Sequence, residues 1–148
     1  MDSILKSELT KVRDQCDWID SPGIPGKPRL RDTCRLELGH FLLYIADARP
    51  FPSMEQEMLV NTVWSGVRPS VTRFRMQKEL DELGLPDASE SETLAAFIKA
   101  GKADKLIRLY KVYGGFMASL SRNSASEGRY ERYMEKMREL CEKEPPDL

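Results

Sequence analysis

Histidine and cysteine are scarce in this chain, which holds one histidine, His40, and three cysteines. No two cysteines form a Cys-x-x-Cys pair, so their spacing indicates neither a zinc site nor a disulfide framework. Cys16, Cys34 and Cys141 each fall in a helical pattern, where a free cysteine behaves as a small buried hydrophobe. We therefore expect reduced thiols, which favours a cytoplasmic protein.

Long apolar runs and an excess of one charge are also lacking. The longest apolar run, Phe41–Ala46, is far shorter than the ~20 residues that a membrane-spanning helix needs. The first residues lack the basic-then-apolar order of a signal peptide. The formal net charge is −1, whereas nucleic-acid binders rely on basic residues that neutralise phosphates. We expect a protein with no membrane span and no nucleic-acid partner.

The residues that could carry catalysis do not form a recognisable constellation. Cys34 and His40 are six residues apart, which places them about 240° apart around a helix and on different faces. Cys16 or Cys141 could still approach His40 in space, which leaves a Cys–His hydrolase as an alternative. Gly114-Gly115 lies in a helical pattern and lacks the spacing of a phosphate-binding loop. We predict that the chain is not an enzyme.

Apolar residues recur every three or four positions along most of the chain, as in amphipathic helices. No segment shows the sustained alternation that predicts strands. We predict an all-α fold, a compact single-domain bundle of about seven helices over residues 1–148. A Pro/Gly-rich loop is expected at 20–31 and a frayed tail at 143–148. The predicted helices cover residues 2–18, 32–45, 54–66, 71–83, 89–101, 102–120 and 124–141.

The segment 32–45 holds the longest apolar run and has apolar residues on several faces, so we expect it to be the central helix. Within it Gly39 costs about 1 kcal/mol relative to alanine, which the close approach of another helix would offset. Capping-box patterns at Ser53–Gln56 and Ser89–Glu92 predict two helix starts. The helix over 71–83 is expected to turn its apolar residues to the core, namely Val71, Phe74, Leu80 and Leu83.

The central helix runs into a carboxylate, Asp47, and two prolines separate it from the next helix start at Ser53. A carboxylate at a helix C-terminus faces the negative end of the helix dipole, which costs roughly 0.3–1 kcal/mol. Pairing with Arg49, or with N–H groups of the helix that begins at Ser53, would recover this energy. Phe51 is held between the two prolines, where it either staples the corner or projects as a contact anchor.

The run Phe41–Asp47, the gap to Ser53 and the acidic, apolar run to Asn61 resemble the tellurite-resistance TerB-like family of helical domains. The resemblance implies a TerB-like bundle and a bacterial accessory protein in a stress-response, secretion or toxin-defence system. It carries over Asp47, Ser53 and either Glu55 or Gln56, at a corner that the family is proposed to use for metal.

This chain departs from the family pattern at the positions on which metal binding would depend. Arg49 and Pro50 stand where relatives have a second Asp and a Gly, and a fixed positive charge repels a cation. Hard divalent ions need six or more oxygen ligands, and Asp47, Glu55 and Glu57 offer at most three carboxylates. We therefore favour no cofactor, with a divalent-metal-binding or sensing domain at the Asp47/Glu55 corner as the alternative.

The leading prediction is a non-enzymatic interaction domain with a protein partner, which contacts Arg49, Phe51 and Glu55. The sequence leaves the oligomeric state open. Basic residues at 27–35 and 68–75 are interpreted as a solvated face with intramolecular pairing. Most methionines fall on or near apolar helical faces and are expected in the core, the alternative being a groove for a partner helix. These are Met54, Met58, Met76, Met117, Met134 and Met137.

Overall fold

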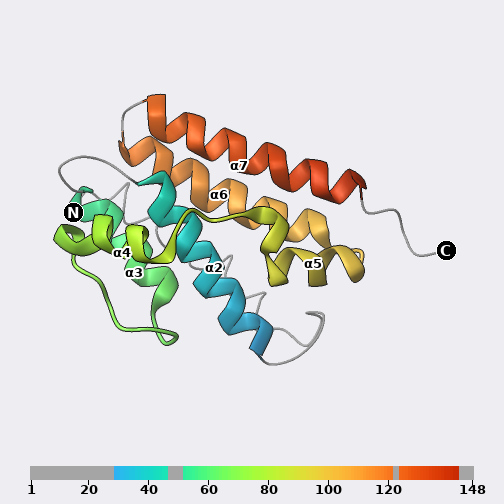
Figure 1. Cartoon of the computed structure of the whole chain (residues 1–148), viewed down its shortest axis with the longest axis horizontal. Coiled ribbons are helices and arrows are strands. Elements are labelled where there is room, and N and C mark those ends of the chain that lie inside the picture. The colour runs from blue at the N-terminus through green and yellow to red at the C-terminus, as the bar shows by residue number, and fades with distance from the viewer. Residues whose placement is uncertain (1–28, 47–51, 122–123, 144–148) are drawn as a thin grey trace.

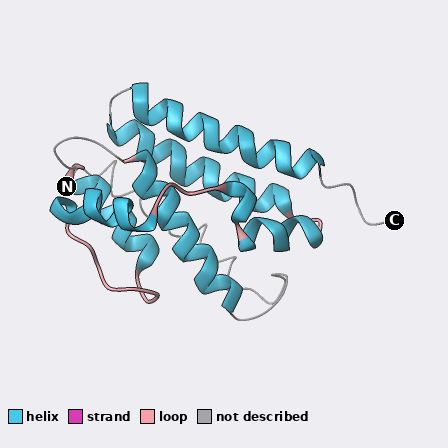
Figure 2. Ribbon diagram, viewed as in Figure 1, coloured by secondary structure: helices cyan, strands magenta, loops and turns pink. Residues whose placement is uncertain are grey.

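The computed structural model describes residues 29–46, 52–121 and 124–143. In these ranges the chain forms six α-helices and two short 3₁₀ helices and contains no strand (Figures 1 and 2). The predicted all-α class is therefore confirmed for this part of the chain. The helix predicted over 2–18 lies outside the described residues, as do Asp47, Arg49 and Phe51.

The helices follow one another with short connections, and α2 lies at their centre (Figure 1). It packs against five others, α3 to α7, which confirms the central helix predicted from its apolar run. In Figure 1 the two longest helices, α6 and α7, lie side by side and cover one side of α2. The elements are α2 (Arg29–Ile45), α3 (Met54–Trp64), η2 (Arg73–Arg75), α4 (Met76–Leu83), η3 (Ala88–Glu90), α5 (Glu92–Lys99), α6 (Ala103–Ser121) and α7 (Ser124–Lys143).

An aromatic cluster joins α2 to α6 and α7. The Phe41 ring centroid lies 4.9 Å from that of Tyr110 and 4.6 Å from that of Tyr133, and all three side chains are buried. Tilted aromatic pairs at such distances stabilise a core by about 0.5–1.5 kcal/mol beyond the area they bury. The cluster fixes the long helices against the middle of α2.

Gly39 lets α3 approach α2 closely, as predicted. A Cβ atom at this position would overlap the indole of Trp64, so no other residue fits without displacing that ring. Trp64 is itself held, because its Nε1 donates to the Leu36 carbonyl at 3.3 Å. The Arg68 guanidinium lies 4.1 Å from the centre of the ring. The contact between the two helices is therefore closely fitted.

Two helix boundaries differ from the prediction. α2 begins at Arg29, inside the segment predicted as a loop at 20–31, because a proline at 28 restricts only itself and the residue before it. The predicted helix over 71–83 is replaced by the 3₁₀ turn η2 followed by the shorter α4. Leu80 and Met76 are buried, as predicted. Phe74 and Leu83 are exposed, although the helical spacing predicted them for the core.

The capping box at the start of α3 is confirmed. The Ser53 N–H donates to Gln56 Oε1 at 2.9 Å, and the Gln56 N–H donates to Ser53 Oγ at 3.2 Å. Gln56 is buried and its Nε2 also donates to Ser121 Oγ at 2.5 Å. The first turn of α3 is therefore attached to the last residue of α6.

The start of α5 is capped differently from the prediction. Ser91, not Ser89, is the N-cap residue, and its Oγ accepts from the Leu94 N–H at 3.0 Å. Glu37 of α2 supplies a second cap, since its carboxylate accepts from the Ser91 hydroxyl at 2.6 Å and the Glu92 N–H at 3.0 Å. A carboxylate at a helix N-terminus is favoured by the dipole. Glu37 thus joins α5 to α2.

Candidate functional site

The structure describes two of the three carboxylates predicted at the corner, Glu55 and Glu57, both in the first turn of α3. Glu55 is exposed. Glu57 Oε2 accepts from the Arg73 N–H at 2.6 Å, so this carboxylate holds the start of η2. The structure therefore gives Glu57 a packing partner and leaves Glu55 as a surface charge beside the corner.

A positive charge lies at the end of α2, close in sequence to Asp47. Arg129 of α7 donates from Nη2 to the Ile45 carbonyl at 3.0 Å and to Ser126 Oγ at 3.1 Å. A cation at a helix C-terminus is favourable, because it faces the negative end of the dipole. Among the described residues, no group of three His, Cys, Asp or Glu side chains is placed to hold a metal ion.

The outer face of α3 carries exposed methionines. Met54 is 63% exposed and Met58 is 40% exposed, and their spacing of four places them on one stripe of the helix. The other four methionines predicted on apolar faces are buried, namely Met76, Met117, Met134 and Met137. The prediction of a methionine core therefore holds for those four and fails for the two on α3.

A third large apolar side chain, Phe74, is 65% exposed on the neighbouring turn η2. Asn61 fixes the chain before it, since its Nδ2 donates to the Val71 carbonyl at 2.8 Å and its Oδ1 accepts from the Val71 N–H at 2.9 Å. Asn61 lies three residues after Met58, on the same side of α3. With Glu57 it holds the segment that carries Phe74 against α3.

We call Met54, Met58 and Phe74 the α3 face. Helical spacing predicts a core position for Phe74, so the sequence pattern did not single out this face. A signal was present, since Phe74 stands between Arg73 and Arg75 and such neighbours are typical of an exposed turn. The α3 face begins beside Glu55 and therefore borders the corner that the sequence singled out.

Several basic residues of the predicted solvated face are paired within the chain. Arg68 forms an ion pair with Glu79, and both side chains are largely buried. Arg35 donates from Nη1 to the Val63 carbonyl at 3.3 Å. The Arg73 guanidinium lies 4.9 Å from the Phe74 ring centre. Arg75 and Lys78 are exposed, so positive charge remains at the surface near Phe74.

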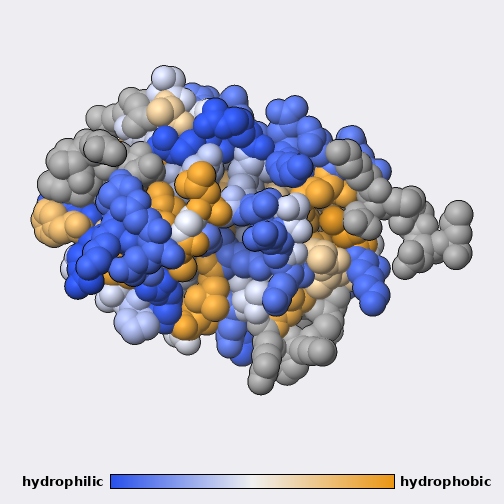
Figure 3. Space-filling view, viewed as in Figure 1, coloured by the Kyte–Doolittle hydropathy of each residue, from blue (hydrophilic) through white to orange (hydrophobic). Residues whose placement is uncertain are grey.

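A second exposed apolar group lies where α4 ends. Leu83 and Leu85 flank Gly84, whose carbonyl lies 2.6 Å from His40 Nε2, and Leu36 lies one turn before His40 on α2. Because a carbonyl only accepts, this ring nitrogen of His40 carries the proton, and the side chain joins α2 to the end of α4. Figure 3 shows apolar atoms reaching the surface over α2 and the segment after α4.

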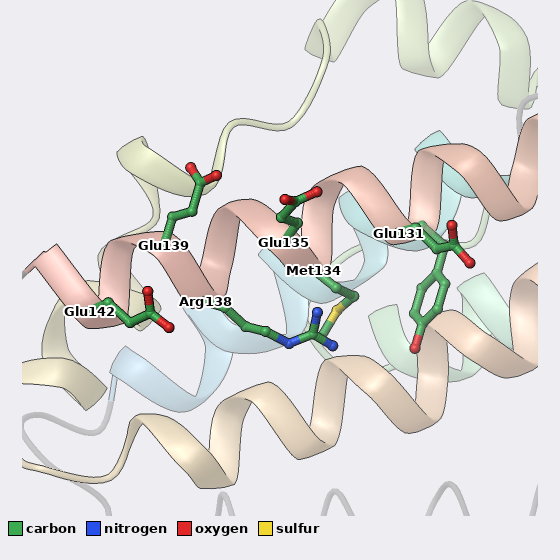
Figure 4. Close-up of a pocket in the computed structure, with 7 residues that line it drawn as sticks. Glu131, Met134, Glu135, Arg138, Glu139 and Glu142 are labelled. Carbon is green, nitrogen blue, oxygen red and sulfur yellow. The ribbon is translucent and has the colours of Figure 1, made fainter.

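A hollow of about 600 Å³ lies beside α7 (Figure 4). In Figure 4, Glu135 and Glu139 point away from α6. The described residues that line the hollow all come from α7, so no second element brings a complementary group to these carboxylates. It has the character of a solvated helix face. The lining residues are Tyr130, Glu131, Met134, Glu135, Arg138, Glu139 and Glu142.

Two buried hydroxyls, those of Tyr110 and Thr93, have no hydrogen-bond partner among the described residues. Burial raises the pKa of Tyr110 well above its ordinary value, with further contributions from Tyr133 and Cys34. Burial also raises the pKa of Tyr133. These tyrosines are therefore neutral packing groups at physiological pH.

In the described part of the chain, no helix is long and apolar enough to cross a membrane. Comparison with protein-family models, curated proteins and solved structures gives no match to this chain. The resemblance to the TerB-like family stays a prediction.

Proposed function

We propose that this chain is a non-enzymatic helical interaction domain that binds a protein partner through the α3 face. The setting implied by the TerB-like resemblance is a cytoplasmic, bacterial accessory protein in a stress-response, secretion or toxin-defence system. The proposal keeps the predicted kind of function. It extends the working surface from Arg49, Phe51 and Glu55 at the corner along the outer side of α3.

The observation that carries the proposal is the exposure of three large apolar side chains on two elements that are joined by hydrogen bonds. Scattered exposed hydrophobic residues are ordinary, whereas several large ones on two adjoining elements are typical of a contact surface. Full burial of one such side chain is favourable by about 1.5–3 kcal/mol, so a partner that covers all three gains useful affinity.

The chemistry of the α3 face also suits a partner. Methionine is flexible and polarisable, and it is over-used on surfaces that adapt to another protein. Phe74 adds a rigid aromatic anchor, and aromatic side chains dominate the binding energy of many interfaces. Two adaptable residues beside one fixed anchor form a small docking surface.

The experiment that tests the proposal is affinity capture of partners from a cell lysate, followed by mass spectrometry. The wild type is compared with Met54→Gln/Met58→Gln/Phe74→Gln, which removes the apolar surface at three exposed positions. The matched control is Leu83→Gln/Leu85→Gln, which changes exposed residues at the end of α4. Circular dichroism and thermal melting establish that each variant is folded.

We expect a partner that the wild type and the α4 control both retain and that the α3 variant loses. A partner retained by the α3 variant would place the interface elsewhere and refute this surface. If no partner is enriched over beads alone, the interaction function itself is refuted.

A further inference from the structure

The stretch from Ser65 to Asp87 contributes little to the core. Only two of its side chains are buried, those of Met76 and Leu80, and three large apolar side chains on it are exposed. The helix α6 is shorter and has seven buried residues. Because the burial of apolar area is the dominant favourable contribution to folding, this stretch is held less firmly than the long helices beside it.

Both ends of the stretch are fixed to the bundle. At the first end, the Val67 and Arg68 N–H groups donate to the Trp64 carbonyl at 3.0 and 3.1 Å. At the second end, the Gly84 carbonyl accepts from His40 Nε2 at 2.6 Å. We call the residues between these ends, 69–83, the strap. In Figure 1 the strap leaves the end of α3 as an open loop and returns through α4.

A glycine with a positive φ stands beside each fixed end. Gly66 has a φ of 85° and Gly84 a φ of 79°, and a Cβ atom at either position would meet nothing within 4 Å. Such glycines commonly end helices, so by themselves they imply no motion. Here they allow the backbone to turn at both ends of the strap without a steric clash.

The first part of the strap is attached to α3 by polar contacts. Asn61 makes two hydrogen bonds to the Val71 backbone, and Glu57 accepts from the Arg73 N–H. All of these groups would bond to water when the strap opens, so each bond contributes little net free energy.

The second part of the strap, α4, is attached by Met76 and Leu80 and by the ion pair of Glu79 with Arg68 at the fixed end. The net contribution of such a pair is small, because both charges lose hydration when it forms. A helix of eight residues is also not stable alone. The strap is therefore held by two apolar side chains and by polar contacts that are individually weak.

We infer that the strap opens transiently as one unit while the rest of the bundle stays folded, and that the α3 face is complete only when the strap is closed. Phe74 lies in the strap, whereas Met54 and Met58 lie on α3, so opening separates them. This second part rests on the proposed function and names its regulation. A partner that covers all three side chains binds the closed state and so favours closure.

The first test is native-state hydrogen exchange of the full chain at urea concentrations below the unfolding transition. The probes are the amides of Val71 and Leu80, which lie in the two parts of the strap. We expect both to exchange through one opening, at least about tenfold faster than the amides of α6 and with a weaker dependence on urea, because less surface is exposed. Exchange of both amides only by global unfolding, as in α6, would overturn the inference.

Asn61→Ala tests whether the opening is concerted, because it removes both bonds to Val71 from outside the strap. We expect exchange at Leu80 to become faster by the same factor as at Val71, about tenfold. Gln77→Ala is the matched control, since it removes a hydrogen bond to Asp81 within α4 and leaves the attachment to α3 intact. Exchange at Val71 should not change in this control. Faster exchange at Val71 alone in Asn61→Ala would show that the strap does not move as a unit.

The link to the α3 face is tested with Met76→Glu/Leu80→Glu, which places charges at the two buried positions and so forces the strap open. The control Lys78→Glu makes the same change in net charge at an exposed position of α4. We expect circular dichroism to show that both variants keep the helical bundle. In the lysate capture the control should retain the partner and the double variant should lose it, although the residues of the α3 face are unchanged.

Retention of the partner by the folded double variant would refute the link between strap closure and the α3 face. Global unfolding of that variant would show that the strap is not separable from the core. The exchange measurements need no partner, so the failure of the proposed function is a distinct result. If the wild type captures no partner, the proposed function fails, and exchange at Val71 and Leu80 still decides whether the strap opens. If the strap does not open but the partner depends on Met54, Met58 and Phe74, only the present inference fails.

Discussion

Replacing Gly39 by alanine tests the contact on which the packing of α2 against α3 depends. The new Cβ would overlap the Trp64 indole, and its closest contact is with Nε1, the atom that donates to the Leu36 carbonyl. Trp64 is 1% exposed and lies beneath the Arg68 guanidinium. The ring therefore has no open space to enter, and either the ring or the helix must move.

The size of the effect follows from opposing contributions. Alanine is favoured over glycine in a helix interior by about 1 kcal/mol. Overpacking costs about 1–3 kcal/mol, and the loss of the Trp64 hydrogen bond adds about 1 kcal/mol. Displacing the ring from Arg68 adds about 0.5–1 kcal/mol. We expect Gly39→Ala to lower the free energy of unfolding by about 2–3 kcal/mol, or roughly 8 °C in Tm for a domain of this size.

Gly115→Ala is the matched control, because Gly115 also lies inside a helix. A Cβ there would meet the Tyr130 hydroxyl at 3.7 Å, which is an ordinary contact. We expect this variant to be as stable as the wild type or more stable by up to about 1 kcal/mol. Urea unfolding and calorimetry of the two variants give the comparison. Equal stability of Gly39→Ala and Gly115→Ala would refute the account of the α2–α3 contact.

Other consequences can be measured in the same way. Glu37→Ala should lower the free energy of unfolding by about 1–3 kcal/mol, because it leaves the N–H groups at the start of α5 without the carboxylate that accepts from them. A variant that melts like the wild type would argue against this cap. Burial raises the pKa of Tyr133 above its ordinary value of 10.0, so the unfolded chain loses this proton at a lower pH than the folded chain does. The Tm should therefore fall as the pH rises above about 10, and it should fall less steeply in Tyr133→Phe. Cys34 is fully buried, so thiol reagents should modify its peptide slowly in the native protein and rapidly in urea, and equal rates would contradict its placement. Asn61→Ala should speed amide exchange at Val71 and weaken partner binding while leaving Tm nearly unchanged. Unchanged exchange would show that Asn61 does not hold this segment.

The sequence was sufficient where the determinants of structure are local. The apolar spacing over 32–45 predicted the central helix, and Ser53 with Gln56 predicted a helix start that the structure confirms. Gly39 signalled a close approach, because glycine inside a helix needs a compensating contact. In these cases the residue types at a few neighbouring positions were enough to predict the local structure.

The sequence was insufficient where the partner lies far along the chain. The carboxylate that caps α5 comes from Glu37, which is separated from Ser91 by 54 positions, so the local pattern at Ser89–Glu92 pointed to the wrong cap. Phe74 shows the same limit. Helical spacing assigned it to the core, but the 3₁₀ turn gives the buried position to Met76. Local periodicity could not reveal that change.

The exposure of the methionines on α3 could not be predicted for a related reason. Met58 and Met134 are the same residue type in similar amphipathic patterns, yet one is 40% exposed and the other is buried. What separates them is which helices cover α3 and α7, and this is decided by the packing of the whole bundle.

A surface that binds a partner gains affinity when it is already ordered before the partner arrives. Asn61 supplies both hydrogen bonds of the Val71 peptide groups, and Glu57 supplies one to the N–H of Arg73. These groups would otherwise bond to water in a freely moving loop. The side chains that hold the turn come from α3 itself, so Phe74 and the two methionines keep one relative position. A phenylalanine on a loose loop would lose backbone entropy on binding, whereas the backbone just before Phe74 is already held by α3 in the folded chain. The leucines around Gly84 are also tied to α2 through His40, so the α3 face is preferred for its methionines and its aromatic ring.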